Sequence, residues 1–195
     1  MQTQSADPSL HIRPAQPRDA EFVLDLSLIA AHGFLPHFFN QIMPEGQDLR
    51  AFMLDSVRDP LSKMSYAKCR IALLDGVPGG MINLDPIPLD PPQPDPDLPA
   101  MFHPLAALEA QSPGTTVIEF LATLPQWRGR GLGRALLDQA ERERGPNGVS
   151  LVVSDNNTSA RRVYERAGFV EVARRRIVHQ GWESPGKEWI LMHRT

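Results

Sequence analysis

A short segment rich in glycine and arginine carries the strongest chemical signal in this sequence. It reads Arg128-Gly129-Arg130-Gly131-Leu132-Gly133, with glycine at every second position. Glycine places no Cβ between the backbone and a ligand, and guanidinium groups donate paired hydrogen bonds to phosphate. If the segment opens a helix, its first N–H groups also bear the positive end of the helix dipole. The pattern predicts a binding site for pyrophosphate or a similar polyanion, rather than a solvated glycine turn.

The residues on either side supply the elements that would hold such a site. The apolar stretch 115–124 predicts a strand before the glycines, and 132–144 predicts a helix after them. The apolar stripe of that helix consists of Leu132, Ala135, Leu136 and Ala140. A second strand is expected at 149–153. A second helix is expected at 157–167, with the stripe Ala160, Val163, Tyr164 and Ala167.

Two other phosphate-binding patterns fit the glycine segment less well. A nucleoside-triphosphatase loop needs Gly-x4-Gly-Lys followed by Ser or Thr, and the sequence has no such run. A dinucleotide fingerprint needs Gly-x-Gly-x-x-Gly. Gly129 and Gly131 fit it, but position 134 is arginine. Asp155 follows the next predicted strand, as that fingerprint requires, so a nicotinamide enzyme stays open as a weaker alternative.

A second pattern lies in the later helix. It reads Asn157-x-x-Ala160-x-x-x-Tyr164-Glu165-x-x-Gly168-Phe169, and it follows Arg128-x-x-Gly131-x-Gly133 in the chain. The two patterns together, in this order and spacing, resemble the GCN5-related N-acetyltransferase (GNAT) superfamily. The resemblance covers the run from Val117 to Phe169, about a quarter of the chain.

This resemblance implies a fold and a cofactor. The fold is α/β, with a central mixed, mostly antiparallel sheet whose strands splay apart, flanked by helices. The co-substrate is acetyl-CoA, with its pyrophosphate held by the backbone of Arg128 to Gly133 and its pantetheine arm bonded to Asn157. The arm would also pair with the strand backbone at Leu121, Ala122, Thr123 and Leu124.

The resemblance also implies the reaction. The acetyl group passes directly to an amine, without a covalent enzyme intermediate, and Tyr164 protonates the departing thiolate. Its place on the apolar stripe directs Tyr164 toward the sheet, although a core tyrosine bonded to backbone gives the same pattern. Asn157 could equally cap the helix, a role that Asn156 or Asp155 could also fill. A non-catalytic CoA-binding module on this fold is the alternative function.

Amine attack needs a base or a water relay, because only a neutral amine is nucleophilic. Glu119 is the first candidate, since it lies in an otherwise apolar strand, on the face expected for Val117, Leu121 and Thr123. A carboxylate there is costly unless it is paired or functional, so a structural ion pair with an arginine is an equal possibility. His37 is the second candidate, although a lone loop histidine is more often a surface or packing residue.

The first half of the chain gives fewer signals. A helix is expected after Pro17, with Asp19 as its cap, and another at 49–57. Between them the aromatic segment 31–43 has no clear period. Phe34, His37 and Phe38 of this segment are predicted to contact the acceptor. The other expected strands are 11–15, 67–74, 77–84, 169–173 and 187–192.

We expect residues 1–195 to form a single domain, with 85–114 as an insertion between two strands. Seven prolines between Asp85 and Ala100 would keep that stretch extended, and a short helix is expected at 104–111. The acceptor is expected to be a small-molecule or peptide amine. Residues 1–114 carry 14 acidic and 7 basic side chains, which would favour a cationic substrate. A solvated surface with an uneven distribution of charge explains the same counts equally well.

The composition also limits the partners. A net charge of −3 and the short run Arg174–Arg176 give no strong signal for nucleic acid. No apolar stretch is long enough to predict a membrane span, and no histidine stands at metal-ligand spacing, so we expect no metal. A single cysteine, Cys69, and no apolar run at the N-terminus predict a cytoplasmic protein. The resemblance makes a homodimer a further expectation.

Overall fold

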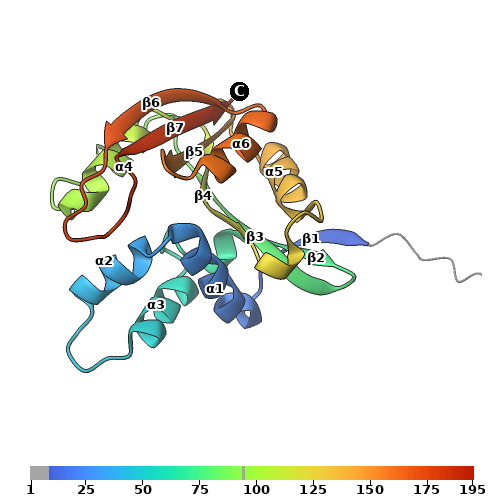
Figure 1. Cartoon of the computed structure of the whole chain (residues 1–195), viewed down its shortest axis with the longest axis horizontal. Helices are drawn as coiled ribbons and strands as arrows, with labels where there is room; N and C mark the ends of the chain where they lie inside the picture. The colour runs from blue at the N-terminus through green and yellow to red at the C-terminus, as the bar shows by residue number, and fades with distance from the viewer. Residues whose placement is uncertain (1–8, 94) are drawn as a thin grey trace, which may run out of the picture.

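Seven strands form one open sheet in the computed structural model, which describes residues 9–93 and 95–195 (Figure 1). Their order across the sheet is β1-β2-β3-β4-β5-β7-β6, and every neighbouring pair is antiparallel except β4 and β5. This arrangement confirms the predicted mixed, mostly antiparallel sheet. The strands are β1 (Leu10–Pro14), β2 (Cys69–Leu74), β3 (Val77–Pro86), β4 (Thr116–Thr123), β5 (Val149–Ser154), β6 (Val170–Arg176) and β7 (Glu188–Arg194).

The parallel pair β4–β5 holds together only at its start. Pairing joins Thr116–Ile118 to Val149–Leu151, although β4 continues to Thr123 and β5 to Ser154. The second halves of the two strands therefore diverge, and they leave a gap in the middle of the sheet. This is the splay that the family resemblance implies.

Two helical layers enclose the sheet (Figure 1). The helices α1 (Ala20–Ala31), α2 (Phe34–Ile42) and α3 (Leu49–Arg58) share one buried cluster with β2 and β3 residues such as Ile71 and Met81. On the other face, α5 (Leu132–Arg142) packs its buried leucines against Ile82 and Ile118, and Tyr164 of α6 (Thr158–Arg166) lies against the same cluster. The helix α4 (His103–Glu109) contacts β6 and β7.

The helix α2 occupies the aromatic segment 31–43, whose residues show no clear helical period. The helix is only nine residues long and follows the turn His32-Gly33, where both residues have left-handed φ values of 47° and 84°. This turn bends the chain by 110° between the preceding helical segment and α2. In the described part of the chain, no single helix is long and apolar enough to cross a membrane.

The insertion is anchored where it leaves and rejoins the sheet. β3 runs to Pro86, two residues beyond the expected end, and Ile87 N–H donates to Thr115 C=O at 2.8 Å. The expected short helix is present as α4, preceded by a 3-10 turn at Ala100–Phe102. Residues 1–8 of the predicted single domain, and Pro94 of the insertion, lie outside the described residues.

Candidate active site

The first turn of α5 presents main-chain donors without an internal partner. Gly131 is its N-cap, with a left-handed φ of 85°, and no side chain caps the helix. The first helical hydrogen bond runs from Ala135 N–H to Gly131 C=O at 3.0 Å. The N–H groups before Ala135 in this turn are therefore free for a ligand, and they carry the positive end of the helix dipole.

The three alternating glycines leave this turn open. A Cβ added at Gly129, Gly131 or Gly133 would meet no heavy atom within 4 Å. Left-handed backbone explains glycine at 129 and 131, but Gly133 has no such φ. The protein's own packing thus gives no reason for glycine at position 133. Close approach of a ligand is a reason that remains.

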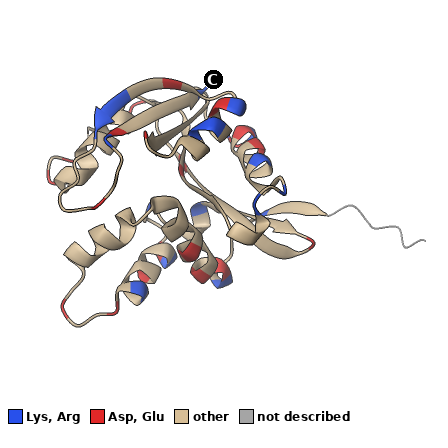
Figure 2. Cartoon of the chain, in the orientation of Figure 1, with Lys and Arg blue, Asp and Glu red and all other residues tan. Residues whose placement is uncertain are grey.

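Two arginines at this turn are free to pair with an anion. Arg128 and Arg130 are exposed, and neither forms an ion pair among residues 9–93 and 95–195. Arg130 lies over the Trp127 ring, with 5.1 Å between its guanidinium carbon and the ring centroid. Arg134 instead binds Asp138 at 3.0 Å. Figure 2 shows basic residues on the segment that leads into α5.

Two glycines of β3, which the sequence analysis did not single out, set the position of this turn. A Cβ at Gly79 would lie 2.7 Å from Leu132 Cδ2, and one at Gly80 would lie 3.1 Å from Leu136 Cδ1. The absent side chains let α5 pack close to the sheet. Consecutive glycines inside a strand are the signal that could have revealed this contact.

The β4 edge offers backbone groups to the gap. Leu124 N–H donates to Gly79 C=O at 2.9 Å, so Leu124 is bonded to β3. Alternate residues of a strand direct their backbone groups to opposite edges. Ala122 therefore also faces β3, while Leu121 and Thr123 face the gap. Of the four predicted pantetheine contacts, these two have free main-chain groups there.

A β-bulge places Glu119 at the point where β4 and β5 part. Asn83 pairs with Phe120 and Leu84 with Ile118, so Glu119 has no partner on β3. The bulge also shifts the alternation, because Ile118 and Leu121 pack in the same cluster. The predicted face shared by Glu119 and Leu121 is therefore wrong. A bulge inserts one residue, and every later side chain changes face.

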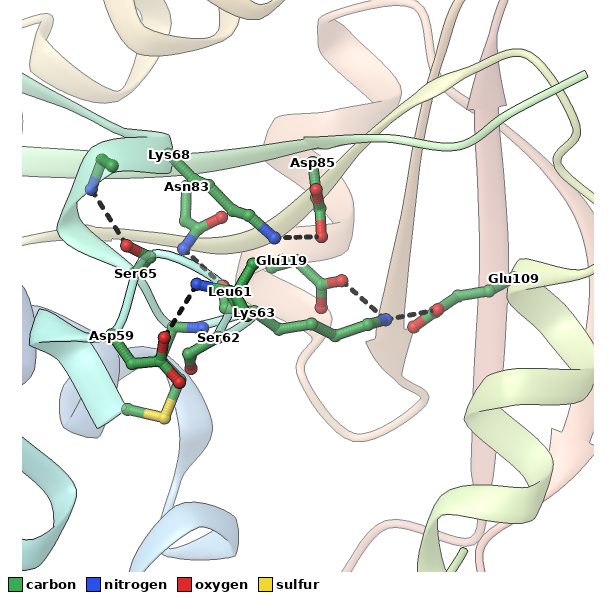
Figure 3. Close-up of polar contacts among 12 residues, drawn as sticks. Asp59, Leu61, Ser62, Lys63, Ser65, Lys68, Asn83, Asp85, Glu109 and Glu119 are labelled. Carbon is green, nitrogen blue, oxygen red and sulfur yellow. Dashed lines mark hydrogen bonds and ion pairs between the residues drawn. The ribbon is translucent and has the colours of Figure 1, made fainter. Parts of the chain in front are cut away.

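Glu119 is paired, but with a lysine rather than the expected arginine. Its Oε1 lies 3.0 Å from Lys63 Nζ, which also donates a hydrogen bond to Glu109 Oε2 at 2.6 Å (Figure 3). Oε1 is shielded from water and meets Lys63 as an ion pair without an aligned hydrogen bond. Burial and the nearby Glu109 raise the pKa of Glu119 to about 7, although Lys63 opposes the shift. This pKa suits a general base near neutral pH.

Tyr164 reaches the sheet side of α6, as predicted. Its ring lies 5.9 Å from that of Phe169, and the side chain packs against the cluster under α5. Among the described residues its hydroxyl has no hydrogen-bond partner, unlike a core tyrosine bonded to backbone. Burial raises the pKa of Tyr164 to about 12. Val163, expected on the same stripe, is 43% exposed because α6 covers the sheet with a narrower face.

Asn157 is the N-cap of α6. Its Oδ1 accepts a hydrogen bond from Ala160 N–H at 3.2 Å, so Asn157, rather than Asn156 or Asp155, takes the capping role. Its Nδ2 lies 3.4 Å from Nε2 of His32, at the turn between α1 and α2. One amide N–H of Asn157 remains for a ligand. Asp19 also differs from its expected role, because its carboxylate binds Arg13 instead of capping α1.

Two of the residues predicted to contact the acceptor lie in an aromatic cluster, called the acceptor wall below, which consists of Phe34, Phe38, Phe102, Trp182 and Trp189. Phe34 is 8% exposed and meets Phe102, Trp182 and Trp189 edge-on at 5.2, 5.1 and 6.0 Å. Phe34 is thus a packing residue, whereas Phe38, 4.7 Å from Phe102, is half-buried. These contacts join α2, the insertion and the segment after β6. The contribution of Trp182 and Trp189 was not predicted from the sequence.

His37 ties α2 to the segment between β6 and β7. Its Nε2 lies 3.1 Å from the Gln180 carbonyl and 2.6 Å from Gln41 Nε2. The side chain of Gln180 in turn accepts a hydrogen bond from Met101 N–H at 3.1 Å. His37 therefore has a structural partner in the predicted acceptor wall.

The sheet removes the nicotinamide alternative, because a dinucleotide-binding fold needs a largely parallel sheet and here only β4 and β5 are parallel. Within the described ranges, no group of three or more His, Cys, Asp or Glu is placed to hold a metal ion.

A splayed sheet with an uncapped helix start beside the splay is the architecture of an acyl-CoA-dependent N-acyltransferase. The model of the acetyltransferase (GNAT) family matches residues 35–169, which is more than half of the chain. The chain belongs to this family, as the sequence resemblance predicted.

Three known proteins illustrate the similarity. Mycothiol acetyltransferase of Beutenbergia cavernae is 44% identical over 69 residues, which are 34% of this chain and 23% of that protein. An N-acetyltransferase from Staphylococcus aureus Mu50 superposes with a TM-score of 0.64 at 18% identity, over 93% of this chain and 98% of that one. Naa50 of Arabidopsis thaliana, in complex with the bisubstrate analogue CoA-Ac-MVNAL, superposes with a TM-score of 0.54 at 13% identity, over 96% of this chain and 99% of that one. At identities of 13–18%, the two superposed structures show similarity of fold alone.

Proposed function

We propose that this enzyme acetylates a primary amine directly, in the gap between β4 and β5. The observation that carries the proposal is the uncapped start of α5 beside that gap. There the free N–H groups from Gly129 to Gly133 would bind the pyrophosphate of acetyl-CoA. The main-chain N–H of Arg128 instead donates to Pro125 C=O at 3.3 Å, so Arg128 would contribute its guanidinium group, as would Arg130. Leu121 and Thr123 would pair with the pantetheine arm, and Asn157 would donate its remaining N–H to it.

Glu119 and Tyr164 would carry the proton transfers. Glu119, with a pKa of about 7, would accept the proton of the amine as its nitrogen attacks the thioester carbonyl. The C–N bond forms and the C–S bond breaks. Tyr164 keeps its proton at every working pH, since its pKa is about 12, and can donate it to the sulfur as negative charge develops. The other product is the free thiol of CoA.

The acceptor would be a small-molecule or peptide amine, bound between α2, the insertion and the segment after β6. Phe38 and His37 lie on this side, and we propose that they contact it, with Phe34 supporting them from below. The name of the mycothiol acetyltransferase supports a small-molecule acceptor as one possibility. A peptide N-terminus is another, since the analogue bound to Naa50 joins CoA to MVNAL.

Turnover tests the proposal. The protein is mixed with acetyl-CoA and a panel of primary amines, and free thiol is followed with a chromogenic disulfide. Thiol release that depends on the amine, with no acetyl-enzyme detected by mass spectrometry, supports direct transfer. Binding of acetyl-CoA without thiol release for any amine would instead support a non-catalytic module, in which Lys63 keeps Glu119 occupied.

The compartment and the assembly belong to the same proposal. The free, buried Cys69 is compatible with a reducing cytoplasm, and we propose that location without a nucleic-acid or membrane partner. A homodimer could pair the outer edge of β6, which borders only β7 in the sheet. Light scattering coupled to size-exclusion chromatography would measure the mass in solution.

A further inference from the structure

Lys63 reaches from the segment after α3 to the point where β4 and β5 part. Its Nζ lies between the carboxylates of Glu109 on α4 and Glu119 on β4, at 2.6 and 3.0 Å (Figure 3). Glu119 is the first β4 residue beyond the last parallel pair, Ile118 with Leu151. A primary ammonium group of the protein itself therefore contacts the proposed base at the head of the gap.

The charges around Glu119 are not balanced. Asp85, Glu109 and Glu119 face only two ammonium groups, since Lys68 binds Asp85 at 2.9 Å and Lys63 serves both glutamates. This excess of negative charge attracts a positively charged acceptor toward the cluster. The two carboxylates that hold the Lys63 ammonium can hold another ammonium in its place.

Lys63 and its partners differ in exposure. The Lys63 side chain is 57% exposed, whereas that of Glu119 is 14% and that of Glu109 is 25% exposed. The Lys63 ammonium can turn into solvent when another ammonium takes its place, because water then solvates the group that leaves and the carboxylates stay paired. The carboxylates cannot do so, because Glu119 is held within β4 and Glu109 within α4.

We infer that the space between Glu109 and Glu119 is the ammonium subsite of the acceptor, which Lys63 fills until an acceptor displaces it. The inference rests on the proposed function. It narrows the acceptor to a primary ammonium on an unbranched stem, such as a lysine side chain or a diamine, because Lys63 is a group of this kind. Glu109 binds the ammonium, and Glu119 binds it and then takes its proton. The insertion thus supplies a specificity-determining residue.

Binding without turnover tests this subsite. The protein is saturated with CoA, which has no acetyl group to transfer, and n-butylammonium is titrated by calorimetry. Lys63→Met keeps the apolar stem and should bind n-butylammonium about tenfold more tightly, while Glu109→Gln should bind it about tenfold more weakly, as expected for one charged hydrogen bond. Lys187→Met, which removes an equal charge at the start of β7, is the control and should not change Kd.

The kinetic readout should follow the binding. The KM for n-butylamine should move with these Kd values, and the KM for acetyl-CoA should stay constant. An unchanged Kd in Lys63→Met overturns the inference. So does a Glu109→Gln variant that shifts the pH profile of kcat without weakening binding, because Glu109 would then only set the charge of Glu119.

The inference and the proposed function can fail separately. If amines are acetylated but neither variant changes the Kd, the subsite is wrong and the function stands. If the Kd values move as expected but no amine ever releases thiol, the ammonium site stands and the catalytic proposal fails.

Discussion

The start of α5 and the aromatic cluster around Phe34 are held in place by different means. At α5, a Cβ added at Gly129, Gly131 or Gly133 would meet no heavy atom within 4 Å, and Arg128 and Arg130 have no ion-pair partner among the described residues. In the cluster, Phe34 and Trp182 are buried, and their neighbours come from distant parts of the chain. The comparison suggests that α5 is shaped for a ligand, whereas the acceptor wall is first a piece of core. Changes at α5 should thus affect binding, and changes in the wall should affect stability.

The largest effect tests the wall. Trp182→Ala should lower the free energy of unfolding by about 3–5 kcal/mol, because a 6% exposed indole leaves a cavity. For a chain of this size the melting temperature should fall by roughly 6–20 °C. Denaturant titration and calorimetric scanning measure both. Val178→Ala, at an exposed site nearby, is the control and should change stability by less than about 0.5 kcal/mol. A stable Trp182→Ala protein with lost activity would contradict the comparison.

The next effect tests the α5 turn. Gly133→Asp should weaken acetyl-CoA binding by about 100-fold or more, because its carboxylate would stand against a pyrophosphate at short range. The same carboxylate should leave the fold intact, or stabilise it by about 0.3–1 kcal/mol, since it lies in the first turn of a helix. Calorimetric titration should therefore show a lower affinity for acetyl-CoA, while thermal unfolding should show an unchanged or slightly higher melting temperature. Gly133→Ala separates the charge from the methyl group. Unchanged affinity in the aspartate variant would place the pyrophosphate elsewhere.

The Tyr164→Phe variant tests whether Tyr164 is the general acid that protonates the departing thiolate. We expect kcat to fall by about 100-fold, at the lower end for general acids, because the raised pKa makes Tyr164 a weak acid. The KM for acetyl-CoA should change little. Stability should also change little, because the hydroxyl has no partner in the described structure. Steady-state thiol release is the measurement, and wild-type kcat in the variant would remove Tyr164 from the acid role.

The smallest effect depends on pH. Glu119 must be deprotonated to act as a base, so the wild-type kcat should rise with pH through about 7. Glu119→Gln should lose this rise and be about tenfold slower at pH 8. The two rates should converge below pH 6, where the wild-type carboxyl group is itself protonated. An identical pH profile in the variant would leave the base to a water relay.

The cofactor side could be predicted from the sequence because its signals are local. The segment from Arg128 to Gly133 and the pattern from Asn157 to Phe169 each lie within one strand-helix or helix-strand unit. Such local patterns can be recognised without knowing which distant residues meet in the fold. The family resemblance that they carry therefore predicted the sheet type and the splay.

The acceptor side depends on contacts between residues far apart in the chain. The residues next to Glu119 in the sequence do not indicate that Lys63 and Glu109 lie beside it in the fold. Likewise, the residues next to Phe34 do not indicate that it packs against Trp182. The bulge at Glu119 is a mismatch between two strands, and one strand alone does not reveal it. The helix α2 was missed because the His32-Gly33 turn interrupts the period on which the expectation depended.

The two glycines of β3 have a consequence for how the affinity of this enzyme could be tuned. β3 borders β4 on the side away from the gap, yet Gly79 and Gly80 determine how deeply α5 sits on the sheet. A single methyl group at Gly79 would lie 2.7 Å from Leu132 Cδ2 and 3.0 Å from Trp127 Cγ, so side chains on both sides of the α5 turn would have to shift. If that turn binds the cofactor as proposed, the affinity can be adjusted from a neighbouring strand, through the thickness of one packing layer.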